Sequence, residues 1–543
     1  MRNAITLLLW SGACVLLGVA LARYAESPLL ILILLTIAGA LVFIATDLSL
    51  YLLFICLPFS FRFILPSKME VQTPTEPLLG MLVVVVFLKR ILGHVTGRSS
   101  QRSEAPFPFV LPLLAYIIAT FLPTFNSPDS FVTVKGAFRA VAYILVSFVG
   151  YELIQHRRDL YRLFVATFPS ALIAVVWTVV VLFYHIDLWQ WTSAYKGTPF
   201  TNYSVYGSFA AYFFLIGLSR LMLDRVPFDR VLWTAITLVF GVGLLMCFSR
   251  GVWLSVIVAI GFVLMHVGAG EEHRRILIAG SALILALVFL SLPGVSNLIL
   301  ERIATVFNPQ FASNRARLLR WGQALLMFMQ SPIIGHGYGA FAILYEEDEA
   351  LVGEYIAQYQ LGAHSEYLQV LAELGIVGFL TWAWTIFALF RYGLHALKEI
   401  QDTHYRSIIV GLMAGQLALL IHLVVNNLLN GDAIGIPFWF MYGLLPAVVH
   451  MAQGEPARRG SGGSECVRGR GSGEARKREN ERRTVAGERV FLPNVPCQSE
   501  TVHWEEKHLT HTSPVFIPVW LVAHRSLLIA SLRNSNLRAS PAR

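Results

Sequence analysis

The stretch "YRLFVATFPSALIAVVWTVVVLFY", residues 161–184, decides the class of this protein, because Arg162 is its only charged side chain. A helix needs roughly 20 predominantly apolar residues to cross the hydrocarbon core of a bilayer. The stretch is long enough to do so, and it is apolar on every side rather than along one stripe. We therefore predict a transmembrane helix here.

Thirteen further apolar runs of similar length occupy the first 451 residues. They lie at 5–22, 28–45, 48–64, 77–93, 107–124, 137–154, 203–222, 230–247, 251–268, 274–292, 366–391, 406–428 and 434–451. The composition agrees, because 56% of the 543 residues are hydrophobic, only 14% are charged, and the mean hydropathy is +0.62. Some runs are closely spaced, so we predict an all-α, polytopic transmembrane bundle of about 12–14 helices over residues 1–451.

The positive charges of the short loops predict how the bundle faces. Cytoplasmic loops carry an excess of Lys and Arg. With a cytoplasmic N-terminus, the inner loops hold Lys89, Arg90, Arg98, Arg102, Arg157, Arg158, Arg162, Arg220, Arg225, Arg230, Arg274, Arg275, Arg391, Lys398 and Arg406. The opposite short loops hold Arg23, Lys68, Lys135 and Lys196. The alternation predicts both ends inside and a large external loop at 293–365, which we expect to contain amphipathic helices.

The two ends of the chain need separate interpretations. Arg2 and the Ala20-Leu21-Ala22 sequence also fit a cleavable signal peptide, but we favour a retained helix because another apolar run follows at once. Residues 452–543 begin with a stretch rich in Gly, Ser, Arg and Glu and have no sustained helical period. We predict a disordered, basic cytoplasmic tail that can contact anionic lipid. Without a folded module, its charge does not predict a nucleic-acid partner.

Three arginines in the predicted external loop contradict the charge rule. On a helix, Arg317, Arg320 and Trp321 share one face, whereas Arg315 points elsewhere. The surrounding leucines supply an apolar surface that can lie against the membrane. The arginines then either reach up to lipid phosphates or bind a phosphorylated ligand through their planar, bidentate guanidinium groups.

Other polar residues are also predicted at the outer boundary of the bundle. Arg250 lies between two apolar runs, where a charge normally needs a partner or an anionic ligand; Arg139, in "GAFRAVAYIL", is a weaker example. His364 lies where the external loop meets the next helix, so it either accepts a proton or only hydrogen-bonds the loop. His422, Asn426 and Asn427 either join helices or face a cavity.

Three motifs in a fixed order resemble the O-antigen ligase family, the Wzy_C-type membrane glycosyltransferases. They are "SRGVWL" at 249–254, "NRARLLRWGQALLMFMQSPIIGHGYGAF" at 314–341 and "HSEYLQVLAELGIVGFL" at 364–380. The resemblance implies transfer of a glycan from undecaprenyl diphosphate to an acceptor hydroxyl at the periplasmic face of the bacterial inner membrane. In ligases this acceptor is the lipid A–core oligosaccharide. The resemblance also implies an inverting reaction that needs no metal, nucleotide or other cofactor.

The resemblance further implies roles for individual residues. Arg250 and Arg317 would bind the diphosphate, with Arg315 or Arg320 assisting. Family members typically have a single arginine four residues before the tryptophan, which selects Arg317 among the three. His364 would orient or deprotonate the acceptor hydroxyl. The expected partners are the carrier-linked glycan, the lipid A–core acceptor and membrane lipids.

Three other functions remain open at this point. An O-antigen polymerase would use a second carrier-linked glycan as acceptor, and a protein O-oligosaccharyltransferase would use Ser or Thr of a protein. A polysaccharide or lipid transporter belongs to a different class, and it predicts charges near the bilayer midplane and an internal repeat. The sequence shows neither feature, so we favour an enzyme.

Overall fold

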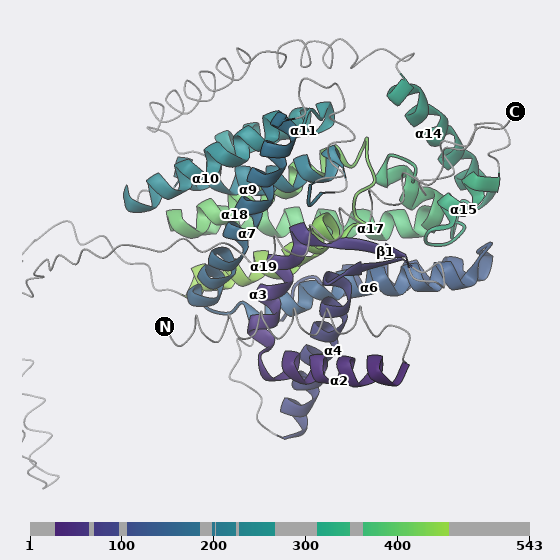
Figure 1. Cartoon of the computed structure of the whole chain (residues 1–543), viewed down its shortest axis with the longest axis horizontal. Coiled ribbons are helices and arrows are strands. Elements are labelled where there is room, and N and C mark those ends of the chain that lie inside the picture. Colours follow the sequence, from purple (N-terminus) through teal and green to yellow (C-terminus); the bar gives the residue numbers. More distant parts are fainter. Residues whose placement is uncertain are drawn as a thin grey trace, which may run out of the picture. The chain divides into compact units, whose positions relative to one another are not determined.

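The computed structural model describes residues 28–64, 70–96, 106–184, 198–200, 202–223, 227–266, 312–347 and 362–454. The helices in these ranges are α2 (Pro28–Ile44), α3 (Thr46–Cys56), α4 (Thr75–Val95), α5 (Val110–Phe121), α6 (Ser130–Leu153), α7 (Arg157–Tyr184), α9 (Tyr203–Leu223), α10 (Pro227–Met246), α11 (Arg250–Met265), α14 (Ala312–Gln330), α15 (Ala340–Glu347), α17 (Glu366–Glu399), α18 (Thr403–His422) and α19 (Asp432–Gly454). Short 3₁₀ helices η1 (Leu57–Phe59) and η2 (Leu122–Asn126) follow α3 and α5. Figure 1 shows their arrangement.

The predicted all-α membrane architecture is confirmed. Twelve of the fourteen predicted runs coincide with described helices, and the other two, 5–22 and 274–292, lie outside the described residues. Within the described part, α6, α7, α9, α17, α18 and α19 are long and apolar enough to span a membrane. Large apolar side chains such as Ile173 of α7 and Ile257 of α11 are exposed, as expected of a surface that faces lipid. The chain is thus a multi-pass membrane protein.

Parts of the prediction differ from the structure or lie outside it. The runs 28–45 and 48–64 were predicted as two spans, but α2 and α3 meet at a bend of 111° and together fit one broken span or a re-entrant loop. The end of the second run is not helical, because β1 (Phe61–Ile64) pairs antiparallel with β2 (Glu70–Thr73). The chain divides into units 1–459 and 460–543, and nearly all of the predicted tail lies outside the described residues.

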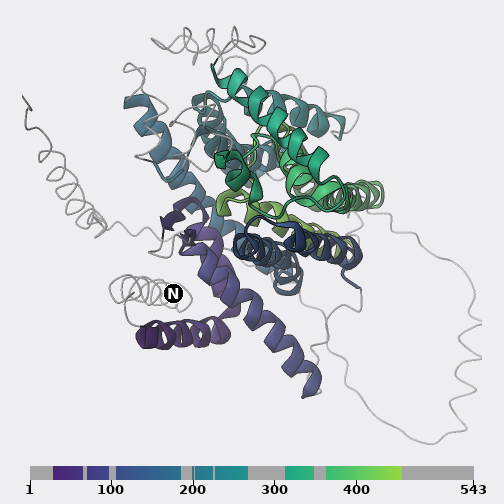
Figure 2. The same ribbon diagram turned by 90° about the vertical axis from the view of Figure 1, so that its right-hand side faces the viewer.

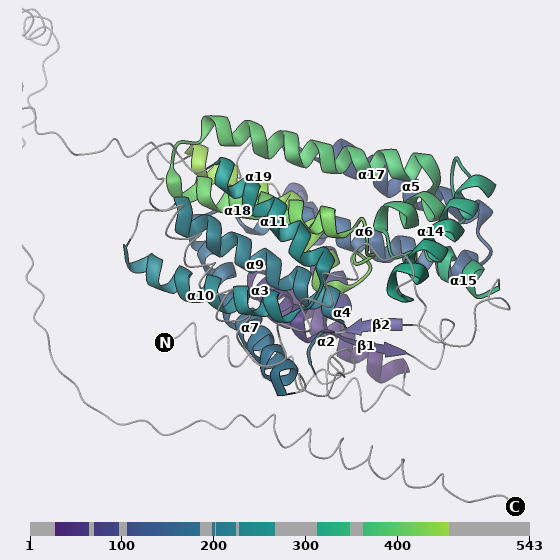
Figure 3. The same cartoon turned by 90° about the horizontal axis from the view of Figure 1, so that it is seen from above.

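Helices α9, α18 and α19 form the interior of the bundle. The apolar windows of α9 and α18 are 78% buried and that of α19 is 89% buried, compared with 44% for α6, α7 and α17. Helix α18 packs along α9, α19 packs along α6, and α5 runs beside α17 (Figure 3). An interior helix that is apolar all round therefore brings its rare polar residues, such as His422, into the centre of the protein.

The predicted external loop contains the amphipathic helix expected from its sequence. On α14, Ala324 and Met327 are buried, whereas Leu318, Leu319 and Leu326 are exposed. Figures 1 and 2 both show α14 beside the green helix α17, and the two helices are in contact. The buried face of α14 is therefore directed to the start of α17, and its exposed leucines can lie against lipid.

A break in α17 holds the end of α14 in place. At Gly375, with φ +61°, the helical ladder opens. The N–H groups of residues 376–377 donate to the carbonyls of residues 332–333, over 2.8 and 3.2 Å. The N–H groups of residues 336–337 donate in return to the carbonyls of residues 372–373, over 3.3 and 2.9 Å. Backbone groups freed at the break thus find partners in the segment that follows α14.

Glycine is required on both sides of this exchange. Gly335 has φ +75°, and a Cβ there would lie 2.3 Å from the carbonyl oxygen of Glu373. A Cβ on Gly375 would lie 2.4 Å from the carbonyl oxygen of Ile333. The glycines at 335, 337 and 339, all with positive φ, therefore form a tight turn, and Gly335 also fixes the position of α14 on α17.

Candidate functional site

Arg250 and Arg317, which we call the arginine pair, meet at one neutral side chain. Arg250 is the first residue of α11, and its Nη2 donates a hydrogen bond to Oδ1 of Asn314 over 3.1 Å. Nη1 of Arg317 donates to the same oxygen over 3.4 Å. Asn314 carries no charge, so it brings two positive charges together without neutralising either. With the partial positive charge of the α11 N-terminus, this arrangement suits an anion with several oxygens, such as a phosphate.

The other two arginines of α14 lie in different surroundings. The side chain of Arg320 is only 3% exposed, and it faces the same region as Trp321, which contacts the backbone of His364. Arg315 is exposed. The predicted separation of Arg315 from the face of Arg317 and Arg320 is confirmed.

His364 lies just before α17, in a backbone conformation that residues other than glycine rarely adopt. Its φ is +53°, and such a conformation costs on the order of 1–3 kcal/mol, so surrounding contacts must hold it. One of them is the hydrogen bond from Nε1 of Trp321 to the His364 carbonyl oxygen, over 3.4 Å. Another is the anchoring of the next residue, Ser365, which caps α17 through the N–H of Leu368.

The protonation state of His364 follows from its neighbours. Burial, then the positive charge of Arg320 and then that of Arg317 lower the pKa of the imidazole to about 3, while a hydrogen bond with Asn426 acts in the opposite direction. The ring is therefore neutral at physiological pH. A neutral imidazole beside a cluster of arginines combines a proton acceptor with an anion site.

Three polar side chains on one face of α17 hold the segment that carries His364. Oε2 of Glu366 accepts hydrogen bonds from the backbone N–H groups of residues 428–429, over 3.0 and 3.3 Å. Oε1 of Gln369 accepts from the N–H of Ala363 over 2.9 Å, and Nε2 of Gln369 donates to Glu373 over 3.1 Å. All three side chains are buried, so they fix the loop rather than meet solvent. Their spacing of three and four residues was visible in the sequence.

A series of buried polar side chains leads from His364 into the bundle. Asn426 hydrogen-bonds the side chain of His364, and its Nδ2 lies 2.8 Å from Nε2 of His422. Nδ1 of His422 lies 2.7 Å from Oγ of Ser208 in α9. A Cβ on Gly251 would lie 2.9 Å from the His422 ring, so the glycine after Arg250 allows α11 to pack on that ring. We call Ser208, His422 and Asn426 the polar chain.

A cavity of about 360 Å³ lies against the same segment. Gly362 and Asn427, which line it, are close in sequence to His364 and Asn426. Other polar side chains that can hydrogen-bond sugar hydroxyls also line it: Lys135, Arg139, Asn202, Tyr338, Gln369, Glu373 and Asn430. The volume falls in the range of roughly 300–1,000 Å³ that is usual for small-molecule sites. Of the predicted pair of asparagines, one therefore joins helices and the other faces a cavity.

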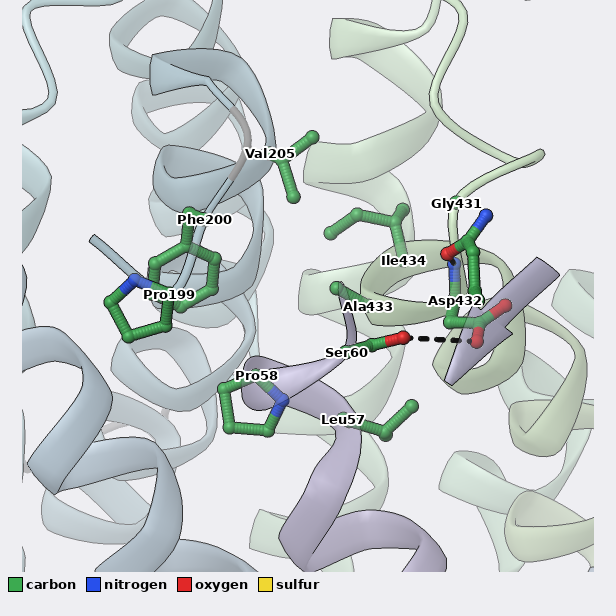
Figure 4. Close-up of a pocket in the computed structure, with 11 residues that line it drawn as sticks. Leu57, Pro58, Ser60, Pro199, Phe200, Val205, Gly431, Asp432, Ala433 and Ile434 are labelled. Atoms are coloured by element: carbon green, nitrogen blue, oxygen red, sulfur yellow. Dashed lines mark hydrogen bonds between the residues drawn. The ribbon is translucent and has the colours of Figure 1, made fainter. Parts of the chain in front are cut away.

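A second, smaller cavity, of about 50 Å³, lies beside Asp432 (Figure 4). Oγ of Ser60 donates to Oδ2 of Asp432 over 3.3 Å, and Thr75 and Tyr143 also donate to this carboxylate. The donors come from three different parts of the chain and surround the buried group. We interpret this cluster as a structural junction at the start of α19, too small to admit a sugar.

The structure thus brings together Arg250, Arg317, Arg320 and His364, as the sequence predicted. Sequence reasoning did not identify Asn314, which joins the arginine pair, or Ser208, which ends the polar chain. Asn314 lies three residues before Arg317, a spacing that indicates contact on a helix. Ser208 had no such indication, because its partner lies 214 positions away.

Comparison with known proteins found a family match in the centre of the chain. Residues 235–383 match the model of a family described as O-antigen ligase (Wzy_C). This range contains the arginine pair, Asn314 and His364, whereas the polar chain lies outside it. A search of curated proteins found no match.

Proposed function

Since residues 235–383 place this multi-pass membrane protein in the O-antigen ligase family, whose members transfer glycosyl groups, we propose that it is an O-antigen ligase. It would move a glycan from undecaprenyl diphosphate to the lipid A–core oligosaccharide at the periplasmic face of the bacterial inner membrane. The observation that carries this proposal is the arginine pair on Asn314 with the neutral imidazole of His364 close by.

In this proposal the arginine pair binds the diphosphate of the donor. Two guanidinium groups can contact oxygens of both phosphates and stabilise the negative charge that develops as the glycan leaves. Arg320 is better placed than Arg315 to assist, because it is buried on the face near His364 and Arg315 is exposed. The exposed leucines of α14 would keep the site beside the lipid, from which the isoprenoid tail enters.

His364 would act on the acceptor. The acceptor hydroxyl oxygen attacks the anomeric carbon and passes its proton to the imidazole. The bond from that carbon to the phosphate oxygen breaks, and undecaprenyl diphosphate leaves with the electron pair. A single displacement of this kind inverts the anomeric carbon and requires no metal or nucleotide. Proton transfer to a positioned base typically contributes about 10²–10⁴-fold to the rate.

The low pKa of His364 links the base that acts on the acceptor to the arginines that bind the diphosphate. With the arginines unbound to ligand, an imidazole with a pKa of about 3 is a weak base. A bound diphosphate would offset the positive charge of Arg317 and Arg320, which are two of the causes of the low pKa. The base would therefore become stronger once the donor is present.

The cavity beside Gly362 supports a glycan substrate. Its polar lining offers several hydrogen-bond donors and acceptors, and it lies within two residues of His364 in the chain. One of the two reacting glycans would bind there, next to the segment that carries His364.

Deletion of the gene in its native host tests the proposal. A ligase mutant should accumulate polymerised glycan on undecaprenyl diphosphate and carry unsubstituted core. Core that carries a single repeat unit would instead identify a polymerase. Normal core glycolipid with unglycosylated secreted proteins would identify a protein O-oligosaccharyltransferase. Both of these results would overturn the ligase assignment but keep the enzyme class.

A further inference from the structure

The polar chain behind His364 contains groups that the proposed reaction does not yet use. His422 is 1% exposed, Ser208 is 4% exposed and Asn426 is 5% exposed. Burying three polar side chains in a membrane bundle is costly unless each finds hydrogen-bond partners. Here each does, and the series ends on the imidazole of His364.

The hydrogen-bond chemistry assigns a direction to the series. Nδ2 of Asn426 can only donate, so Nε2 of His422 accepts and carries no proton. The remaining proton of a neutral His422 is then on Nδ1, from which it is donated to Oγ of Ser208. With its nitrogen used in this way, Asn426 has only Oδ1 left for His364, and this oxygen must accept. One ring nitrogen of His364 therefore holds its proton toward Asn426.

We propose that Asn426, oriented by His422 and Ser208, selects the tautomer of His364 and directs its unprotonated nitrogen at the acceptor hydroxyl. This inference rests on the proposed function. Asn426 and His422 are positioning residues, because they act through His364 and do not touch the reacting atoms. A base whose proton sits on the wrong nitrogen cannot accept another from the acceptor, so the tautomer decides whether the ring works.

A neutral amide suits this position better than a carboxylate. His364 is faced by Arg317 and Arg320 from α14 and by Asn426 from the turn after α18. The Glu366 carboxylate is engaged with the backbone of residues 428–429. A second carboxylate next to the ring would attract the nearby guanidinium groups and compete with the diphosphate. An amide accepts the proton of the ring without adding charge.

The backbone around Asn426 makes the orientation rigid. The N–H of Glu366 lies 2.9 Å from the carbonyl oxygen of Leu423 and 3.1 Å from that of Asn426. The start of α17, which carries His364, is thus tied to the turn that carries Asn426. Gly251 packs against His422, so the helix that begins with Arg250 is part of the same assembly. The positions of the base and of the arginine pair are therefore set together.

The test is the kinetics of Asn426→Ala, Asn426→Asp and His422→Phe in the full-length protein. The assay is transfer from a purified undecaprenyl-diphosphate glycan to core glycolipid in nanodiscs. For Asn426→Ala and His422→Phe we expect kcat to fall roughly 100-fold, with the donor KM changed less than about threefold. A purely structural defect would instead lower the amount of folded protein and leave kcat per folded molecule unchanged.

Asn426→Asp gives a readout that folding does not produce. A carboxylate still accepts the His364 proton, and His422 can reverse its tautomer to donate to it, with the Ser208 hydroxyl then donating to Nδ1. Its negative charge raises the pKa of His364, so the acid limb of the kcat profile should move to higher pH by about one unit or more. Because the active form is the neutral ring, a raised pKa means that activity is lost earlier on acidification.

A matched control lies on the same two helices. Gln416 of α18 is also fully buried and accepts a hydrogen bond from Tyr212 of α9, over 2.5 Å. Gln416→Leu should lower stability and leave kcat and the pH profile unchanged.

The inference is overturned if wild-type protein transfers glycan and His364→Ala does not, yet the Asn426 variants keep wild-type kcat and pH profile. If Asn426→Ala does not fold, an unshifted acid limb in Asn426→Asp overturns it. Absence of transfer by the wild type would instead refute the proposed function.

Discussion

Two arginine sites in this protein place a positive charge at the edge of an apolar bundle in different ways. Arg139 of α6 forms an ion pair with Glu76 of α4, so its charge is balanced within the protein. Arg250 and Arg317 both donate to the neutral oxygen of Asn314. In the sequence Arg139 and Arg250 look alike, since each is a single arginine among apolar residues.

We infer from this difference that the type of partner helps to distinguish a structural charge from a binding charge. A carboxylate partner neutralises the guanidinium and fills its donor groups with oxygens of the protein. An amide partner positions the guanidinium and leaves its charge able to attract an anion. The following predictions test whether this distinction holds.

The largest expected effect is at the base beside the arginine pair. His364→Ala should lower the transfer rate by about 10²–10⁴-fold, because the acceptor hydroxyl loses its proton acceptor. The measurement is glycan transfer per folded molecule in isolated membranes. His336→Ala is the control, because that ring only donates to the carbonyl of Met327, over 2.9 Å, and should affect stability alone. Equal rates for the two variants would remove His364 from the mechanism.

The arginine pair should give the next largest effect. Arg250→Ala and Arg317→Ala should each lower kcat/KM by about 10²–10³-fold, the usual loss when one preorganised electrostatic contact is removed. Lysine at either position should restore only part of the activity, because it cannot bind phosphate oxygens bidentately. Arg315→Ala should lose less than either, since Arg315 is exposed. A greater loss at Arg315 than at Arg317 would contradict the proposal that Arg317 binds the diphosphate together with Arg250.

The burial of His364 and the positive charges beside it also predict an unusual pH profile. The neutral ring is the active form, and its pKa in the free protein is lowered to about 3. The acid limb of kcat/KM, which reports the free enzyme, should therefore lie well below pH 5. A base with the ordinary pKa of about 6.5 would retain roughly 3% of its activity at pH 5, a loss of about 30-fold. A half-maximal rate near pH 6.5 would mean that neither burial nor the arginines lower the pKa of this ring.

Converting the partner of the arginine pair tests the comparison directly. Asn314→Asp should give Arg250 and Arg317 the kind of partner that Arg139 has, and the new carboxylate should compete with the diphosphate. We expect a roughly tenfold higher KM for the donor, equivalent to about 1.4 kcal/mol of lost binding. Asn314→Ala removes the positioning contact but adds no charge, so its KM should rise less. Unchanged donor binding in the aspartate variant would refute the distinction between the two kinds of partner.

Local patterns account for the parts of the site that the sequence predicted. Apolar length predicted the helices, and steps of three and four residues placed Arg317, Arg320 and Trp321 on one face. His364 was recognisable because a titratable side chain stands where a loop becomes a helix. Each of these inferences needs only residues that are close together in the chain.

The parts that the sequence did not predict depend on distant residues. The break in α17 cannot be read from its own residues, because its open hydrogen bonds are satisfied by residues 332–337. Ser208 acquires meaning only through His422, on another helix. The partners of Arg139 and Arg250, which separate a structural charge from a binding charge, likewise come from other elements.

The smallest effect on transfer is expected where the charge is already balanced. Glu76→Gln leaves Arg139, which is 21% exposed, without its carboxylate partner. We expect a loss of about 1–3 kcal/mol in unfolding free energy and a rate per folded molecule within about twofold of wild type. Glu399→Gln is the control, because the His395–Glu399 pair is exposed and should contribute less than about 1 kcal/mol. Thermal unfolding in detergent measures the first quantity and glycan transfer the second. Arg139 also lines the cavity of about 360 Å³. If Glu76→Gln abolished transfer in folded protein, the charge of Arg139 would take part in the reaction, and a carboxylate partner would no longer mark an arginine as structural.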